Sequence, residues 1–313
     1  MSKPKLHSRR GDGNQGRPDG GPGGPASRRI GGRIGEEIVR IGSFDVTAVI
    51  DASAVIDPVA LWSSAAGTTG AGGATKGARQ VDWAQHASLL RADGRLDMPV
   101  GSFLVRRGDH IVLIDLGYGP EPPAGLSGGS LLANLGELGV RPGDVTDVVF
   151  SHLHPDHVGW ASLSGAATFP HASYHCHADG WSHFVTGSAV PGVAALLSPL
   201  ADRMEMWTGV HRAAPGIDLV AAPGHTPGNA YVILSSGTER AFLLGDIVHC
   251  PVELVDDDWA GLGDVDPVLA RAVRMKLARE LEATDAQVAG AHFPGMHFGR
   301  LLAGQGSRSW RWS

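Results

Sequence analysis

A run of seven residues, 151–157 (SHLHPDH), constrains the fold more than any other feature because four of its side chains can bind a metal ion. These are His152, His154, Asp156 and His157. Imidazoles and carboxylates are ligands that zinc prefers in proteins. The run follows an apolar segment, residues 145–150, that predicts a buried strand. Pro155 disfavours helix at the preceding residue, so a turn at the strand end can aim these side chains at one point.

Three further candidate ligands stand in loops beside predicted strands: His225, Asp246 and His292. Taken alone, each histidine is as easily an ordinary loop residue, and Asp246 is more often a turn residue. Strand-end loops on a rigid scaffold are nevertheless where binding residues concentrate. A chance cluster of surface histidines is the alternative for residues 151–157. With the three downstream residues the set reaches five histidines and two aspartates, which is enough for two metal ions.

The hydrophobic pattern predicts two runs of strands, each followed by helix. Strands are predicted at 38–50, 102–105, 111–115, 145–150, 219–222, 230–234, 241–244 and 286–289, and helices at 131–138 and 267–283. Residues 63–80 are small and are predicted to form a loop. This order favours two sheets covered by helices over one doubly wound sheet.

The N-terminal residues 1–35 contain ten Gly and four Pro and almost no large apolar side chains. Such a segment cannot offset its ordering entropy by burial, so we expect a disordered tail. The tail carries eight basic and two acidic residues, a net charge of +6. We expect one folded domain over residues 36–313.

Composition excludes several classes of function. Because the whole chain has a charge of −6, the part after the tail carries about −12, which argues against a nucleic-acid partner. No apolar run approaches the roughly 18 residues of a membrane span. Arg9-Arg10 is not followed by the apolar region of an export signal. With two cysteines, Cys176 and Cys250, we expect reduced thiols and a cytoplasmic protein.

The order and spacing of the candidate ligands resemble the metallo-β-lactamase superfamily. The resemblance covers the chain from about residue 38 and implies an α+β fold, a four-layer αββα sandwich of two mixed sheets covered by helices. It also implies two divalent metal ions, with zinc as the first choice. His152, His154 and His225 would hold the first ion, Asp156, His157 and His292 the second, and Asp246 both. Asp115 would support the site from behind the ligands.

Residues 245–254 (GDIVHCPVEL), with Asp264, Asp266, Arg274 and residues 292–294, are similar to one branch of this family. That branch contains methyl parathion hydrolase and certain N-acyl homoserine lactonases. His249 departs from its pattern, because well-known lactonases have tyrosine at this position. His249 is therefore a candidate catalytic residue beside Asp156 and Asp246, with a packing role as the alternative.

The resemblance implies a hydrolase in which a metal-bridging hydroxide opens a lactone or cleaves a related ester, since two metal ions lower the pKa of a shared water to about 7. The alternatives are a phosphotriesterase, hydrolysis of a β-lactam or thioester, dehalogenation, and a non-catalytic metal-binding sensor. The expected partner is a small-molecule substrate, and the resemblance implies a homodimer. An apolar substrate site could be lined by Trp62, Trp83, Trp160, Phe293 and Met296, although plain core or surface packing is the favoured interpretation for each. The scattered histidines at 171, 175, 177, 183 and 297 raise the possibility of a third metal site, but they are expected to be structural.

Overall fold

The computed structural model describes residues 37–64, 68–69, 73–74, 82–257, 259–261, 263–304 and 306–313. The predicted tail at 1–35 and most of the predicted loop at 63–80 lie outside these residues and stay predictions. The described part of 63–80 differs from the loop prediction, because residues 63–64, 68–69 and 73–74 belong to short strands. Everything below concerns the unit that spans residues 33–313.

Seven strands form the first sheet, in the order β1-β2-β6-β7-β8-β11-β12. The first four pair antiparallel, and β7, β8, β11 and β12 pair parallel. Their bounds are β1 Ile38–Ile41, β2 Phe44–Ile56, β6 Leu96–Arg107, β7 His110–Ile114, β8 Asp147–Val149, β11 Ser173–His177 and β12 Met204–Trp207.

The second sheet also has seven strands, in the order β13-β14-β15-β16-β18-β19-β20. Only the β16–β18 pair is parallel. Their bounds are β13 Val210–Ala214, β14 Ile217–Ala221, β15 Ala230–Ser236, β16 Glu239–Leu243, β18 Gln287–Ala289, β19 Gly299–Ala303 and β20 Arg308–Trp312. Both sheets are therefore mixed, as predicted.

Shorter elements cover and connect the sheets. The α-helices are α1 Pro58–Leu61, α2 Leu131–Glu137, α3 Pro155–Val158, α4 Ala178–Trp181, α5 Pro191–Leu197, α6 Val252–Val255 and α7 Pro267–Glu282. The short 3-10 or π segments are η2 Trp83–Leu89, η3 Pro142–Asp144, η4 Ser182–Thr186, η5 Ser198–Arg203, η6 Gly245–Ile247 and η7 Pro294–Met296. Three small strand pairs are β3 (Trp62–Ser64) with β17 (Trp259–Gly261), β4 (Thr68–Thr69) with β5 (Gly73–Ala74), and β9 (Ser162–Leu163) with β10 (Ala166–Ala167).

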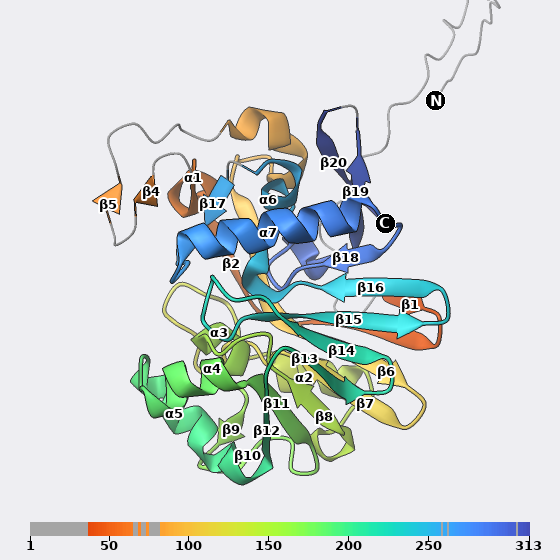
Figure 1. The fold of residues 1–313 in the computed structure, drawn as a ribbon. Coiled ribbons are helices and arrows are strands. Elements are labelled where there is room, and N and C mark those ends of the chain that lie inside the picture. The colour runs from red at the N-terminus through yellow and green to blue at the C-terminus, as the bar shows by residue number, and fades with distance from the viewer. Residues whose placement is uncertain are drawn as a thin grey trace, which may run out of the picture. The chain divides into compact units, whose positions relative to one another are not determined.

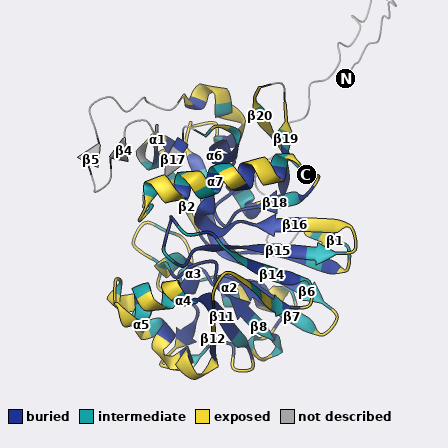
Figure 2. Cartoon of the chain, viewed as in Figure 1, coloured by how far each residue is buried: buried dark blue, intermediate teal, exposed yellow. Residues whose placement is uncertain are grey.

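Alternation along the strands produces the layers, because successive side chains of a strand point to opposite faces. On β15, Val232 and Leu234 pack in the core between the two sheets, whereas Tyr231 packs in a separate core with Leu277 of α7. On the first sheet, Leu113 of β7 faces a third core formed with α2 and α5. Figure 1 shows α7 along the second sheet and α5 beside the first. Figure 2 shows the buried strands inside and the exposed faces of these helices outside.

No single helix within the described ranges has the length and apolar character needed to cross a bilayer. One bent pair, Ala178–Thr186 with Pro191–Arg203, meets that criterion by length and composition when taken together. Side chains of both segments, among them Phe184 and Leu197, pack in the core against the first sheet.

The four-layer α+β fold agrees with the prediction, as do helices α2 and α7 and the strands β6 and β7, which pair antiparallel. Both cysteines are buried free thiols, as expected. The single strand predicted at 38–50 is wrong. The chain turns back at Gly42, whose φ is +56°, so that β1 and β2 form an antiparallel hairpin. The β-branched residues on both sides of the turn had concealed it.

Gly42→Ala tests how strictly this turn requires glycine. A Cβ at Gly42 would stand 2.4 Å from Ser236 Oγ, and a strained backbone conformation costs about 1–3 kcal/mol. Because the contact with Ser236 adds to this strain, we expect Gly42→Ala to lower the free energy of unfolding by more than the strain alone, measured by urea denaturation. Gly108→Ala is the matched control, because its φ is +57° but nothing lies within 4 Å of the added Cβ. Equal losses in the two variants would contradict a tight contact at Gly42.

Candidate metal centre

Strand ends bring all the predicted site residues to one edge of the two sheets. Asp115 directly follows β7, and residues 151–157 follow β8, which runs parallel to β7. His225, Asp246 and His292 lie in the loops after β14, β16 and β18. These three strands run in the same direction, because β14 and β16 are each antiparallel to β15 and β18 is parallel to β16. The loops that carry the site therefore meet.

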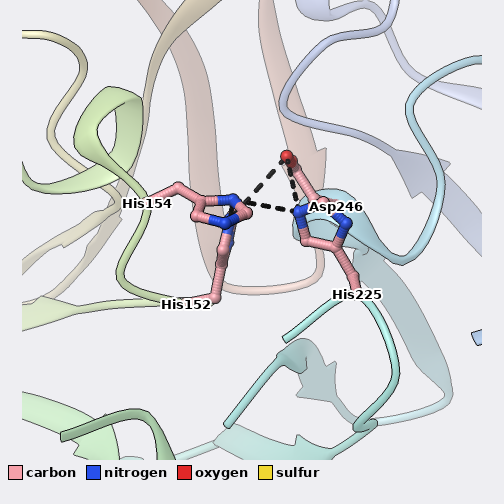
Figure 3. Close-up of side chains that lie close together, drawn as sticks. All are labelled: His152, His154, His225 and Asp246. Atoms are coloured by element: carbon pink, nitrogen blue, oxygen red, sulfur yellow. Dashed lines mark hydrogen bonds and ion pairs between the residues drawn. The ribbon is translucent and has the colours of Figure 1, made fainter. Parts of the chain in front are cut away.

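The first cluster consists of His152, His154, His225 and one oxygen of Asp246. Figure 3 shows the three imidazoles and the carboxylate converging. His154 Nδ1 lies 2.8 Å from His152 Nε2 and 3.1 Å from His225 Nε2. Asp246 Oδ2 lies 3.8 Å from His152 Nε2 and 3.6 Å from His225 Nε2.

The second cluster consists of Asp156, His157, His292 and the other oxygen of Asp246. Asp246 Oδ1 lies 3.3 Å from both His157 Nε2 and His292 Nε2. Asp156 Oδ2 lies 3.6 Å from His157 Nε2 and 3.4 Å from His292 Nε2. The two oxygens of Asp246 thus face two different sets of candidate metal-ligand atoms.

This donor spacing fits two metal ions. Ligand atoms about 2.0–2.2 Å from a tetrahedral zinc ion lie about 3.3–3.6 Å from one another. The separations given above run from 2.8 to 3.8 Å, and all ligand atoms of each cluster lie within 4.8 Å of one another. His157 Nε2 and Asp246 Oδ1 are buried and make no hydrogen bond with any part of the chain that the structure describes. A cation between them would satisfy both atoms, since buried polar groups normally have partners.

Contacts behind the ligands fix their orientation. His157 Nδ1 lies 2.9 Å from Asp115 Oδ2, as the predicted supporting role of Asp115 requires. Asp115 has a φ of +62° and is held by Ser151, whose backbone N and Oγ donate to its two oxygens. His292 Nδ1 lies 2.9 Å from the carbonyl oxygen of Pro99. With Nδ1 of each ring beside one of these oxygens, the Nε2 atoms of His157 and His292 face the cluster.

Burial holds two imidazoles of the first cluster, those of His152 and His154, neutral. Desolvation lowers the pKa of His152 well below its usual value. Desolvation and the neighbouring His225 lower the pKa of His154 to about 4. Neutral imidazoles have lone pairs to give to a metal ion, so this cluster is suited to coordination near neutral pH.

The second cluster is dominated by its carboxylates. Burial alone would raise the pKa of Asp156, but His157 and His292 lower it to about 2. The histidines near Asp246 likewise lower its pKa well below the usual range against the effect of burial. Burial would lower the pKa of His292, but Asp246 and Asp156 raise it to about 9. The buried anions therefore favour positive charge at this point, which a cation would supply.

A buried ionic network behind the clusters includes two acids whose roles were not predicted. Asp264 Oδ1 lies 3.0 Å from His225 Nδ1. Glu253 Oε1 lies 3.6 Å from His249 Nδ1, and Oε2 accepts a hydrogen bond from the His249 backbone N. Arg274 of α7 stands between the acids, 3.7 Å from Glu253 and 3.8 Å from Asp264. A glutamate inside the apolar stretch 247–254 was the signal that could have pointed to this network.

His249 lies at the cluster itself. Its Nε2 is 3.4 Å from Asp246 Oδ2. Burial would lower the pKa of the His249 imidazole, but Asp246 and Glu253 raise it well above the usual value. His249 is thus a proton-carrying group in contact with the carboxylate that the two clusters share.

All five residues considered for an apolar lining pack in hydrophobic cores, in agreement with the favoured packing interpretation: Trp160, Phe293 and Met296 lie in three separate cores, and Trp62 and Trp83 share a fourth. Trp62 and Trp83 do lie together, with ring centroids 5.5 Å apart. Trp62 Nε1 also donates a hydrogen bond to Glu253. Of the predicted lining, this pair connects to the metal centre through the buried network.

Asp264→Asn should weaken metal binding at the first cluster by about 10–100-fold, the usual cost of losing a group that orients a ligating histidine. The amide keeps the size of the side chain but removes the charge behind His225. The measurement is zinc affinity by competition with a chromophoric chelator. Asp179→Asn is the control, because Asp179 is exposed and lies beside His177, outside both clusters. Equal affinities in the two variants would contradict the orienting role.

Comparisons with known proteins agree with this geometry. A family model described as the metallo-beta-lactamase superfamily matches residues 96–292. The N-acyl homoserine lactonase AiiB of Agrobacterium fabrum is 28% identical over 177 residues, covering 48% of this chain and 62% of AiiB. Metallo-beta-lactamase domain-containing protein 1 of Xenopus laevis is 33% identical over 192 residues, covering 59% of this chain and 70% of that protein. The match to AiiB thus spans less than two thirds of that relative's length.

Among solved structures, AidC, a dizinc quorum-quenching lactonase in complex with a product, has a TM-score of 0.72 at 23% identity. The match covers 88% of this chain and 96% of AidC. At this identity the likeness shows the fold alone. The family model covers more than half of the chain, and the Xenopus relative is similar over most of its own length. The chain therefore belongs to the metallo-beta-lactamase superfamily, as its motifs predicted.

Proposed function

We propose that this protein is a dinuclear metal-dependent hydrolase that opens a lactone or cleaves a related small-molecule ester. The observation that carries the proposal is the shared carboxylate of Asp246. Its Oδ2 faces the donors of His152 and His225, and its Oδ1 faces those of His157 and His292. One carboxylate that serves two donor sets is suited to hold two cations a short distance apart.

Two divalent cations, with zinc as our choice, would supply an activated water and polarise the oxygen of the substrate. The protein's own part is to hold the ions and orient the reactants. Three histidines and Asp246 form one binding site, and Asp156, two histidines and Asp246 form the other. Asp156 thus serves as a ligand close to the reacting atoms.

Lactone hydrolysis adds water across the acyl C–O bond, so the departing ring oxygen must gain a proton. We assign this proton transfer to His249, whose Nε2 lies beside the shared carboxylate. Glu253 stands behind the imidazole at Nδ1 and holds its orientation. Histidine is the most common general acid in enzymes, and the group needs to be within hydrogen-bond reach of the atom it protonates.

The names of related proteins support lactone hydrolysis as the proposed reaction. AiiB is named an N-acyl homoserine lactonase, and AidC is described as a dizinc quorum-quenching lactonase. Phosphotriester hydrolysis is the other reaction to test, because the same pair of cations can activate a phosphoryl group. The cytoplasmic location, the homodimer and the absence of nucleic-acid and membrane partners stay predictions from the sequence.

The test is a substrate panel with zinc-loaded protein: short- and long-chain N-acyl homoserine lactones, a simple aryl ester and an aryl phosphotriester. We expect the highest kcat/KM on a lactone, and no turnover after chelation until zinc is restored. Preferred turnover of the phosphotriester would reject the lactone assignment while keeping the dinuclear hydrolase. Hydrolysis that survives chelation would reject the proposal as a whole.

A further inference from the structure

A third group of metal-binding side chains lies outside the candidate metal centre. It consists of His175 on β11, Glu205 on β12 and His211 on β13. His175 Nδ1 lies 3.2 Å from His211 Nε2 and 3.5 Å from Glu205 Oε2. His211 Nε2 lies 3.9 Å from the same Glu205 oxygen. These separations resemble those within the two clusters that surround Asp246.

These three residues come from both sheets and lie where the chain passes from the first sheet to the second. Strand β12 is the last strand of the first sheet, and β13 is the first strand of the second. Only Thr208 and Gly209 connect these two strands. The neighbours of His175 on β11, Tyr174 and Cys176, pack against the helices, so His175 points the other way, toward the second sheet. The three donors thus meet where the chain crosses between the sheets.

A carboxylate orients His175 as carboxylates orient the ligands of the metal centre. Asp147 Oδ1 lies 3.2 Å from His175 Nε2, and Thr146 Oγ1 lies 2.7 Å from Asp147 Oδ2. Burial would raise the pKa of Asp147, but these two hydrogen bonds lower it. With its Nε2–H directed at Asp147, His175 has its Nδ1 lone pair on the side of the other two candidate metal ligands, Glu205 and His211. Asp264 makes the equivalent contact with His225.

A hydrogen bond between the two imidazoles would account for their separation but not for the whole arrangement. Glu205 Oε2 lies within 4 Å of both facing ring nitrogens, so three donor atoms of different residues surround one point. His211 is also held from the side, because its ring stacks on Trp207 with an interplanar angle of 12°.

We propose that His175, Glu205 and His211 form an accessory site for a divalent transition-metal ion of the zinc class. Two imidazoles and one carboxylate suit zinc, whereas calcium and magnesium prefer oxygen ligands. Three protein ligands leave a fourth position to solvent. The side chains of His211 and Glu205 are 25% and 56% exposed, so an ion can enter directly. When bound, the ion links β13 to the first sheet, because His175 and Glu205 belong to that sheet and His211 belongs to β13. This assignment departs from the structural role expected for His175 from the sequence.

The test compares zinc content and thermal stability in untagged full-length protein and in a His211→Ala variant. After equilibration with excess zinc and removal of free metal, we expect the wild type to hold one more zinc ion per chain than the variant. Excess zinc should raise the Tm of the wild type above that of the variant, whereas magnesium should not. The difference in zinc content does not depend on how many ions the metal centre holds, so a failure here leaves the proposed hydrolase untouched.

Two further variants keep the result interpretable. Glu205→Gln alters an exposed side chain that the fold does not need, so it should weaken the extra zinc even if His211→Ala folds poorly. His171→Ala removes an exposed histidine outside the group, whose ring contacts the Gly143 carbonyl, and should leave zinc content and Tm shift unchanged. Equal zinc content in wild type, His211→Ala and Glu205→Gln would overturn the site and leave an ordinary hydrogen bond between two imidazoles.

Discussion

Asp246→Ala is expected to lower kcat/KM by more than about 100-fold, because loss of a group that merely orients a ligand already costs about 10–100-fold. Asp246 is buried, and its two oxygens face two donor sets. Its removal takes a ligand from each site and leaves Asp156 as the one carboxylate of the second cluster that faces His157 and His292. Metal content should fall together with turnover. Both are measured on the same preparation, the metal content by elemental analysis and the turnover as the rate of lactone hydrolysis.

Asp218→Ala is the control for this experiment. Asp218 lies on β14 in the same sheet and pairs with Arg212 at the surface, away from both clusters. It should leave metal content and kcat/KM unchanged. Near-normal turnover of Asp246→Ala with both ions retained would contradict the bridging role.

Arg274→Ala is expected to lower the free energy of unfolding by about 3–5 kcal/mol, the usual cost of leaving buried charges without their partner. The guanidinium is 3% exposed, and the facing carboxylates of Glu253 and Asp264 are 0% and 1% exposed. Arg274 Nη1 also donates to the backbone carbonyl of Ile247, 2.9 Å away, in the segment that contains Asp246. The substitution therefore leaves two buried anions uncompensated and loosens a metal-site loop.

The measurement is urea unfolding of metal-loaded protein, with Arg279→Ala as the control. Arg279 is on the same helix, α7, but exposed, and its hydrogen bond is to the carbonyl oxygen of Met275 within that helix. Its loss should change stability by less than about 0.5 kcal/mol, as for most surface substitutions. Similar losses in the two variants would show that Arg274 contributes helix propensity rather than charge compensation.

The strand ends that carry the site could be predicted because each combines an apolar run with a ligand-type residue just beyond it. Residues 145–150 before His152 and residues 241–244 before Asp246 are such pairs. Five strands of the two sheets, β11, β12, β13, β19 and β20, were not predicted, and two of them show a related reason. β11 (SYHCH) alternates apolar residues with histidines, and β20 (RSWRW) alternates tryptophan with arginine. Their polar positions interrupt the apolar run that marks a buried strand.

Contacts between residues far apart in the chain could not be predicted from local patterns. Trp62 reaches Glu253 across 191 residues, and His225 reaches Asp264 across 39. Each pairing depends on how β3, α6 and the loop before α7 meet behind the metal centre. The same holds for His175 and His211, which stand in different sheets.

The most direct test of the dinuclear account is lactone hydrolysis as zinc is returned stepwise to metal-free protein. We expect little activity up to one equivalent of zinc and a steep rise toward two, because one ion alone leaves half of the Asp246 site empty. The titration is run on the Glu205→Gln variant beside the wild type, because the proposed accessory site would take up zinc of its own; the variant, whose change lies outside the metal centre, should reach full activity at two equivalents. Full activity in metal-free protein, or a plateau at a single equivalent, would contradict the account.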